Sequence, residues 1–267
     1  MDTTTEERVR AVQLVDWLLA RGRSSITTSE IAAVLGIPQD QVRRRLHAPA
    51  SRGEWVSPAR GLWIPVPAQF RLWGAPEGIE IIDAMMAHLG AGYYVGWLTA
   101  AEIHGAAHQA PQVFQVATDR AVQDRQVGRT RFTFATRTAL RHIPTVAHPT
   151  RAGTAMVSTR EATMLDIAAD ISLAGGIDNA ATVLIELAED SRDADALAAA
   201  AAHHCAAALR RAGWVLDRLG GLDTDTLHQL ADKHDAAPSL LDPTGPTTGH
   251  IDQHWQLRIN RDVQEES

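Results

Sequence analysis

The spacing of apolar residues near the start of the chain predicts two helices separated by a polar turn. In residues 7–21 apolar side chains recur every three or four positions, and "RGRSS" then breaks the pattern. A second helix is expected over residues 28–35, because Thr27 or Thr28 can cap its start and Gly36 ends it. The chain therefore begins with two short helices.

A third helix follows almost at once. Pro38 suits the first turn of a helix, which we expect over residues 38–47. On this helix Val42 and Leu46 fall on one side and face the first two helices. Because only the three residues 36–38 separate it from the helix before, the pair has helix-turn-helix spacing.

Two short strands are predicted next, over residues 54–56 and 62–66. The turn between them, residues 57–61, contains Pro and Gly, and Arg60 lies at its tip. Three helices followed by such a hairpin predict a winged helix-turn-helix domain, which we assign to residues 1–73.

The outward side of the third helix is polar and basic. It carries Asp40, Arg43, Arg44 and His47, with Gln39, Gln41 and Arg45 on its flanks. Arginine and glutamine donors match phosphate oxygens and purine edges in a major groove, so we expect the glutamines, the arginines and His47 of this helix, together with Arg60, to bind DNA. An arginine-rich proteome could produce the same run as ordinary solvated surface, and winged helices also serve as protein-contact modules.

From residue 74 onward helical and strand patterns alternate, which predicts a larger, helix-rich α/β domain over residues 74–267 and an α+β fold overall. The expected helices cover residues 77–89, part of 93–105, 161–171, 177–188, 193–219 and 222–234. The expected strands cover 112–118, 131–136 and 154–159, with 238–250 as a loop and 254–260 as a last strand or extended tail. A capping box, Ser158 to Glu161, opens the helix at 161–171.

Charge is distributed unevenly along the 267 residues, whose formal net charge is −7. Residues 1–70 hold 9 Arg against 7 acidic residues, whereas residues 156–267 hold 8 basic residues against 19 acidic ones. An acidic surface suits a basic protein partner and avoids DNA, although solvation of alanine-rich helices accounts for the excess equally well.

The single cysteine, Cys205, excludes an internal disulfide and a Cys-rich zinc site, which favours a reducing compartment. The first residues lack the basic and apolar regions of a signal peptide, and no apolar run reaches membrane length. We expect a soluble cytoplasmic protein without a membrane contact. Because no sustained heptad repeat is present, we expect a monomer.

An enzyme would have to use histidines or carboxylates, since the only lysine is Lys233 and no GxxxxGK[ST] phosphate loop is present. His104 and His108 are four residues apart beside Glu102, but the sequence EIHGAAH is not the zinc motif HExxH. We therefore expect structural histidines and no metal or other cofactor.

Two further groups are weak candidates for chemistry. His203 and His204 adjoin Cys205, but neighbouring positions on a helix face different ways, and packing explains them better. Asp166 and Asp170 are one turn apart and are expected on the wet face of their helix. The alternative to a DNA-binding regulator is a DNA-associated enzyme, a nuclease or nucleic-acid-modifying enzyme, with a His or acid site in the C-terminal domain.

Three segments after the predicted winged helix carry a resemblance to a known family. They are "YVGWLTAAEIHG", "MVSTREATMLDIAAD" and "RRAGWVLDRLGG", and their order and spacing are similar to AbiEi-type antitoxins of bacterial abortive-infection toxin-antitoxin systems. The resemblance implies a transcriptional autorepressor that binds repeats in its own promoter. It also implies a neighbouring nucleotidyltransferase-like toxin, which the larger domain helps to suppress, and no catalytic residues. The predicted wing departs from the family pattern, because its turn is short and carries a single arginine. We therefore expect no substantial contact of this wing with the minor groove.

Overall fold

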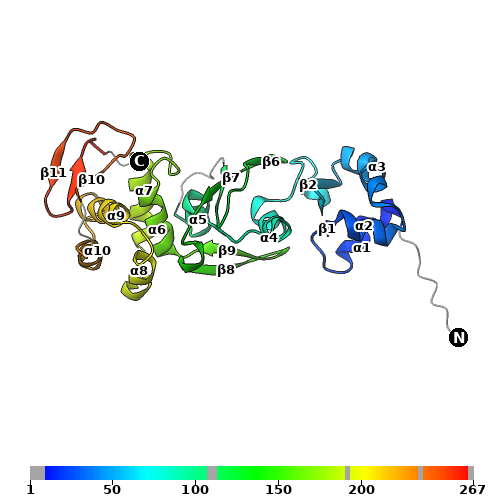
Figure 1. Cartoon of the computed structure of the whole chain (residues 1–267), viewed down its shortest axis with the longest axis horizontal. Coiled ribbons are helices and arrows are strands. Elements are labelled where there is room, and N and C mark those ends of the chain that lie inside the picture. Colours follow the sequence, from blue (N-terminus) through cyan, green and yellow to red (C-terminus); the bar gives the residue numbers. More distant parts are fainter. Residues whose placement is uncertain (1–9, 107–112, 190–192, 234–236, 264–267) are drawn as a thin grey trace.

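The computed structural model describes residues 10–106, 113–189, 193–233 and 237–263. Figure 1 shows an elongated molecule, with the N-terminal helices at one end, a sheet in the middle, and further helices and a small sheet at the other end. It is a mixed α+β fold, as the sequence predicts. No helix within the described ranges combines the length and apolarity that a membrane span requires.

The N-terminal unit combines short helices with a small sheet. Its helices are η1 (Ala11–Gln13), α1 (Leu14–Leu19), α2 (Thr28–Leu35) and α3 (Gln39–Ser51). Its strands are β1 (Ile26–Thr27), β2 (Trp55–Ala59) and β3 (Leu62–Pro65), which form an antiparallel sheet in the order β1-β3-β2. Strand β1 was not anticipated from the sequence, because a two-residue strand has no periodicity of its own.

Three boundaries differ from the prediction. The first helix ends at Leu19 and begins with a 3₁₀ turn, and residues 1–9 lie outside the described ranges. Helix α3 continues past the predicted end at 47, because the buried Pro49 is tolerated near its C-terminal end. Strand β2 continues to Ala59, so the turn to β3 is shorter than the predicted 57–61.

The turn between α2 and α3 forms as the sequence predicts. The Thr27 side chain accepts a hydrogen bond from the Glu30 backbone nitrogen at 3.3 Å, and the Glu30 carboxylate accepts one from the Thr27 backbone nitrogen at 2.7 Å. This capping box fixes the start of α2. Gly36 ends the helix in the left-handed region, at φ 63°, where a residue without a side chain is least strained.

The middle of the chain is a six-stranded mixed sheet in the order β6-β7-β5-β4-β9-β8. The strands are β4 (Tyr93–Val95), β5 (Val113–Thr118), β6 (Arg125–Val127), β7 (Thr130–Thr136), β8 (Thr145–Thr150) and β9 (Gly153–Ser158). The pairs β5 with β7 and β4 with β9 are parallel, and the other pairs are antiparallel. Residues 93–105, predicted as a helix, begin as β4, and α5 (Trp97–Ile103) starts only after Gly96.

Both faces of this sheet are buried, which explains its apolar strands. Tyr94 belongs to the core shared with the C-terminal helices, whereas its neighbour Val95 belongs to the core shared with α4 (Gly78–Leu89). The α4 core also contains Ala59, Leu62 and Ile64 of the N-terminal sheet. The N-terminal unit therefore packs one face of its sheet against α4 and the other against its own helices.

The C-terminal helices are α6 (Arg160–Ala169), α7 (Ile177–Glu189), α8 (Ala194–Ala201), α9 (Ala206–Arg218) and α10 (Asp225–Ala231). A last sheet, ordered β10-β12-β11, contains β10 (Ser239–Leu240), β11 (His250–Asp252) and β12 (Leu257–Ile259). Two 3₁₀ turns, η2 (Ala68–Phe70) and η3 (Leu140–His142), complete the chain.

Several predictions for this region need correction. The helix expected over 193–219 is two helices, because the chain turns at His203 to Cys205 and buries His204. The N-cap of α6 is Thr159, whose side chain accepts from the Ala162 nitrogen, and Ser158 is instead buried at the end of β9. The expected loop at 238–250 contains β10 and the first residue of β11.

Candidate nucleic-acid interface

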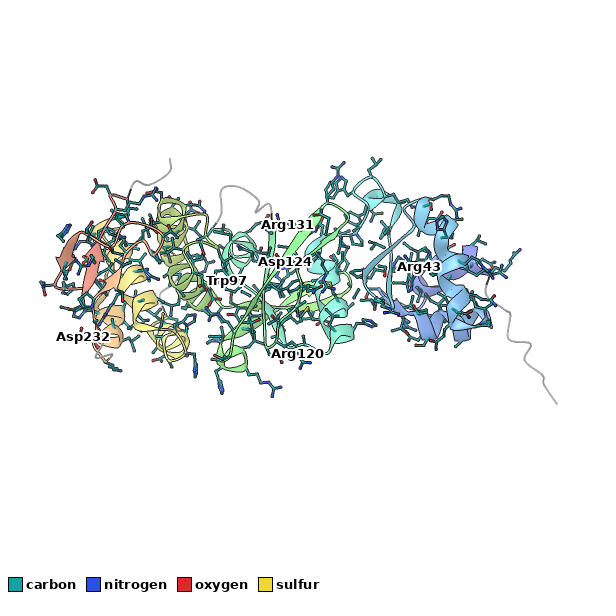
Figure 2. All side chains as sticks on the ribbon, turned by 45° about the horizontal axis from the view of Figure 1, so that its top comes forward. Arg43, Trp97, Arg120, Asp124, Arg131 and Asp232 are labelled. Atoms are coloured by element: carbon teal, nitrogen blue, oxygen red, sulfur yellow. The ribbon has the colours of Figure 1, made fainter. Side chains whose placement is uncertain are left out.

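Helix α3 has one buried side and one free side. Val42 and Leu46 are fully buried and pack with Leu14, Leu18 and Ile31 of the first two helices. With 13 residues the helix is about 20 Å long, which suits a major groove. Figure 2 shows Arg43 on this end of the molecule, away from the central sheet.

The predicted DNA-binding residues of α3 lie together on its free side. Gln39, Arg43, Arg44, Arg45 and His47 are exposed, and Gln41 is partly exposed. Within the described ranges, none of their side chains takes part in a hydrogen bond or an ion pair with another residue. The three guanidinium groups are therefore available to an external acceptor, and the turn before them is formed.

Arg60 occupies a different setting. Its side chain is exposed, but its backbone carbonyl oxygen lies 2.9 Å from Nε2 of His88 at the end of α4. The neighbouring Pro58 carbonyl accepts a hydrogen bond from the Arg125 guanidinium at 3.1 Å. The structure thus gathers the α3 residues on one helix and places Arg60 at the junction with the larger domain.

A buried charged cluster lies in the C-terminal core, where the sequence predicted a wet face. Asp166 is fully buried, and its Oδ1 lies 2.5 Å from an Arg137 nitrogen and 2.9 Å from Nε2 of His204. The other His204 nitrogen lies 2.7 Å from the Ala200 carbonyl oxygen. Asp170, one turn later, is exposed, so only half of the predicted pair faces solvent.

Two aromatic residues of "YVGW" border this cluster. Burial, and then the neighbouring Asp166 carboxylate, raise the pKa of Tyr94 far above its usual range, so its hydroxyl stays protonated. Trp97 is buried beside Arg137 and starts α5 with φ 49°, an uncommon value for a residue with a side chain. Sequence reasoning missed this cluster because its members come from four separate segments.

The histidines considered for metal binding have structural contacts. Nε2 of His104 lies 2.8 Å from the Ser158 carbonyl oxygen, and burial lowers the pKa of His104. His108 lies outside the described residues. His203 stacks on His142, and Cys205 is exposed at the start of α9. Among the residues that the structure places, no three His, Cys, Asp or Glu side chains are grouped to hold a metal ion.

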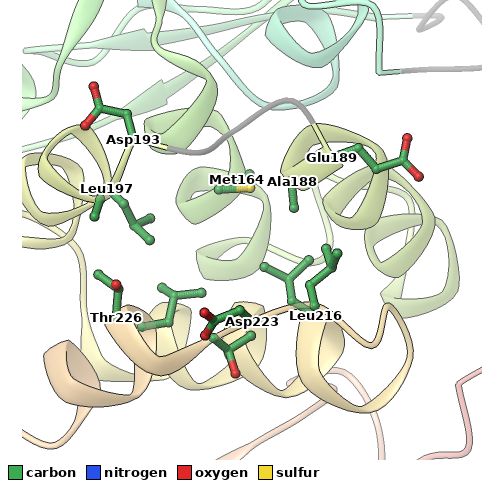
Figure 3. A pocket seen from close by; sticks show the side chains of 12 residues that line it. Met164, Ala188, Glu189, Asp193, Leu197, Leu216, Asp223 and Thr226 are labelled. Atoms are coloured by element: carbon green, nitrogen blue, oxygen red, sulfur yellow. The ribbon is translucent and has the colours of Figure 1, made fainter.

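The C-terminal helices enclose a pocket of about 530 Å³, shown in Figure 3. Apolar side chains, including Met164, Leu197 and Leu216, face its interior, and the carboxylates of Glu189, Asp193 and Asp223 lie around it. Asp193 also accepts hydrogen bonds from the backbone nitrogens of Asp195 and Ala196 in α8, and Asp223 accepts one from the nitrogen of Asp225. The pocket therefore combines an apolar interior with a negative rim.

Comparisons with known proteins bear on the larger domain and on the fold. Residues 94–218 match the family model described as the AbiEi antitoxin C-terminal domain. Among curated proteins, none matches the chain. A crystal structure of the RV2827C protein from Mycobacterium tuberculosis is similar over 92% of this chain and 90% of that chain, with a TM-score of 0.65 and 17% sequence identity.

At that identity the structural likeness concerns the fold alone. The family match begins within β4 and ends with α9, so it includes the first two segments that carry the resemblance and residues 210–218 of the third. An antitoxin role implies a toxin as partner in a toxin-antitoxin system. The comparisons therefore support an AbiEi-type antitoxin, through a family match that covers residues 94–218.

Proposed function

We propose that residues 1–73 are a winged helix-turn-helix domain that binds operator DNA through α3. The observation that carries this proposal is the free side of α3, where three exposed arginines and two glutamines have no partner in the described structure. An ordinary solvated helix face mixes charges of both signs, whereas this side carries three arginines and a single acid, Asp40. The order of the N-terminal elements, with α2 and α3 joined by a tight turn, supports the same proposal.

In this proposal the chain is an antitoxin that also represses transcription of its own operon. The arginines contact phosphates and guanine edges, and Gln39 and Gln41 contact adenine edges. The operator consists of promoter repeats, each bound by one copy of a monomeric protein. Arg60 is a peripheral contact, because its hairpin packs against α4 and its turn is short.

Residues 74–267 control the toxin, which we propose to be a nucleotidyltransferase encoded beside this gene. The acidic excess of residues 156–267 and the negative rim of the 530 Å³ pocket suit a basic surface on the toxin. Structural contacts hold both His104 and Asp166, which disfavours the enzymatic alternative for these two described residues.

Repression and neutralisation can be tested separately in cells. The test variant combines Arg43→Ala, Arg44→Ala and Arg45→Ala, and the control combines Arg120→Ala, Arg141→Ala and Arg218→Ala, which removes the same charge elsewhere. With a reporter behind the upstream region, wild type and control repress, whereas the test variant does not. All three proteins still protect cells that express the neighbouring toxin. Full repression by the test variant would refute the assignment of α3.

A further inference from the structure

The pocket among the C-terminal helices is lined by small side chains where two helices meet. Helix α7 ends and helix α8 begins at the pocket, and they contribute Ala188 and Ala194 to its wall. Figure 3 shows Met164 of α6 between them, and Leu216 of α9 and Leu227 of α10 add to the apolar lining. Protein cores are close-packed, so a space of about 530 Å³ has the size of a ligand pocket and not of a packing defect.

The rim of this pocket is strongly negative. Residues 188–197 and 222–226, which flank the pocket, contain six acidic residues and one basic residue. One carboxylate oxygen each of Asp193 and Asp223 accepts backbone hydrogen bonds at the starts of α8 and α10. Within the described ranges, the second oxygen of each, and both oxygens of Glu189, make no hydrogen bond or ion pair. The rim can therefore pair with cations of another molecule.

The pocket lies far from the proposed DNA-binding helix. In Figure 1, α8 and α10 lie at the end of the molecule that carries the last sheet, and α3 lies at the opposite end. Helices α6 to α9, which provide most of the pocket wall, belong to the residues that match the antitoxin family model. A protein seated on this pocket would leave the free side of α3 exposed.

An occupant of this pocket must bring an apolar group for the interior and positive charge for the rim. Nucleic acid does not fit, because its phosphates repel the rim carboxylates. The nucleotidyltransferase toxin of the proposed function does fit. An enzyme that binds nucleoside triphosphates presents a basic surface around these polyanions, and such a surface attracts an acidic one.

We propose that this pocket is the docking site for the toxin. Its occupant is a basic segment of the toxin, which inserts an apolar side chain between α7, α8 and α10 and pairs its Lys or Arg residues with Glu189, Asp193 and Asp223. This inference rests on the proposed antitoxin function and deepens it, because it names the surface that the toxin contacts. Neutralisation then takes place by direct contact.

A variant that fills the pocket tests the apolar part of the contact. Ala194 is exposed at the first residue of α8 and lines the pocket, so Ala194→Trp occupies the space without replacing a core residue. Ala194→Ser leaves the space open and is the control. Affinity of the full chain for the purified neighbouring toxin is measured by isothermal titration calorimetry. Wild type and Ala194→Ser bind alike, and Ala194→Trp binds at least about ten-fold more weakly. Equal affinity of the three proteins would overturn the proposal.

A second variant tests the rim without changing side-chain size. It combines Glu189→Gln, Asp193→Asn and Asp223→Asn, and asparagine still caps the start of α8. The control removes the same charge at exposed positions outside the pocket lining, with Glu102→Gln, Asp170→Asn and Asp262→Asn. At low salt the rim variant binds the toxin at least about ten-fold more weakly than the control, and its affinity depends less on salt. The same affinity and salt dependence for both variants would contradict the assignment of the rim.

Further measurements separate this proposal from the proposed function. Wild type that protects cells against the toxin without binding it would overturn the docking site and leave the antitoxin function intact. Wild type that gives no protection would refute both. Self-association of wild type that Ala194→Trp abolishes would assign the pocket to a second copy of the chain and overturn the docking of the toxin. Because α3 is distant, both test variants are expected to bind the upstream duplex like wild type, which also shows that they fold.

Discussion

At the scale of single residues, the molecule uses charged side chains in two opposite ways. Arg43, Arg44 and Arg45 are exposed and have no partner among the residues that the structure describes, whereas Arg137 and His204 are held by the fully buried carboxylate of Asp166. An unpaired guanidinium on a helix surface can bind an acceptor on another molecule, while a paired guanidinium in the core favours a single packing of the segments around it. The two groups therefore respond differently to substitution.

Arg44→Ala tests recognition by a single side chain. If Arg44 contacts a base edge, the variant binds the operator duplex more weakly by about 1 to 3 kcal/mol, and discrimination at that base pair is relaxed. If Arg44 contacts only phosphate, the loss is smaller and equal for all sequences. Titrations with the operator and with single-base variants distinguish these results, and no loss for any sequence would exclude Arg44 from the interface.

Asp166→Ala tests the buried cluster. Because it leaves Arg137 and His204 without their common acceptor, the free energy of unfolding should fall by about 3 to 5 kcal/mol in urea denaturation. Asp170→Ala, one turn later and exposed, should cost less than about 1 kcal/mol. Similar small losses for both variants would show that the cluster contributes little to stability.

His104 should make the fold sensitive to mild acid. Burial lowers its pKa from the ordinary value of 6.5, so the unfolded chain takes up a proton at a pH where folded His104 is still neutral. The stabilisation is complete above about pH 6.5 and is lost as pH falls towards the lowered pKa. Between pH 7.5 and 5.5, the free energy of unfolding should fall more for wild type than for His104→Gln. An equal fall would contradict this assignment.

At the scale of elements, local signals predicted the N-terminal unit well. Thr27, Glu30 and Gly36 specify α2 and its ends through contacts within a few residues, so the sequence reveals them. The free side of α3 was predictable for the same reason, because helical periodicity places Val42 and Leu46 opposite the arginines.

Elements that depend on distant partners were not predictable. The sequence pattern predicts a helix where β4 lies, because the three residues of β4 form a strand only by pairing with β5 and β9 in other parts of the chain. The break between α8 and α9 depends on the contact of His204 with Asp166, 38 positions earlier. The contact of the β2–β3 hairpin with α4 likewise has no local signal.

Gly36→Ala tests the turn between α2 and α3. An alanine at φ 63° should lower the free energy of unfolding by about 1 kcal/mol, because the left-handed region is strained for a residue with a Cβ. Gly36→Asn should cost less, since asparagine tolerates this conformation. Thermal or urea denaturation of the two variants gives the comparison, and a stabilising alanine would show that the turn has another conformation.

At the scale of the whole molecule, the N-terminal unit and the antitoxin domain share a hydrophobic core around α4. The β1-β3-β2 sheet forms part of this contact, so the unit that contains α3 packs, through α4, against the central sheet. We expect the orientation of α3 relative to the antitoxin domain to be the same for every bound copy, which would fix how neighbouring copies, and any bound toxin, lie along the promoter.

The central claim is that the free side of α3 binds duplex DNA. The most direct test is the affinity of the full chain for a fluorescent duplex from the region upstream of its gene, with and without alanine at Arg43, Arg44 and Arg45. The account predicts saturable binding by wild type and a loss of at least about 100-fold in the variant, whose melting temperature is unchanged. Equal affinity of the two proteins for that duplex would contradict it.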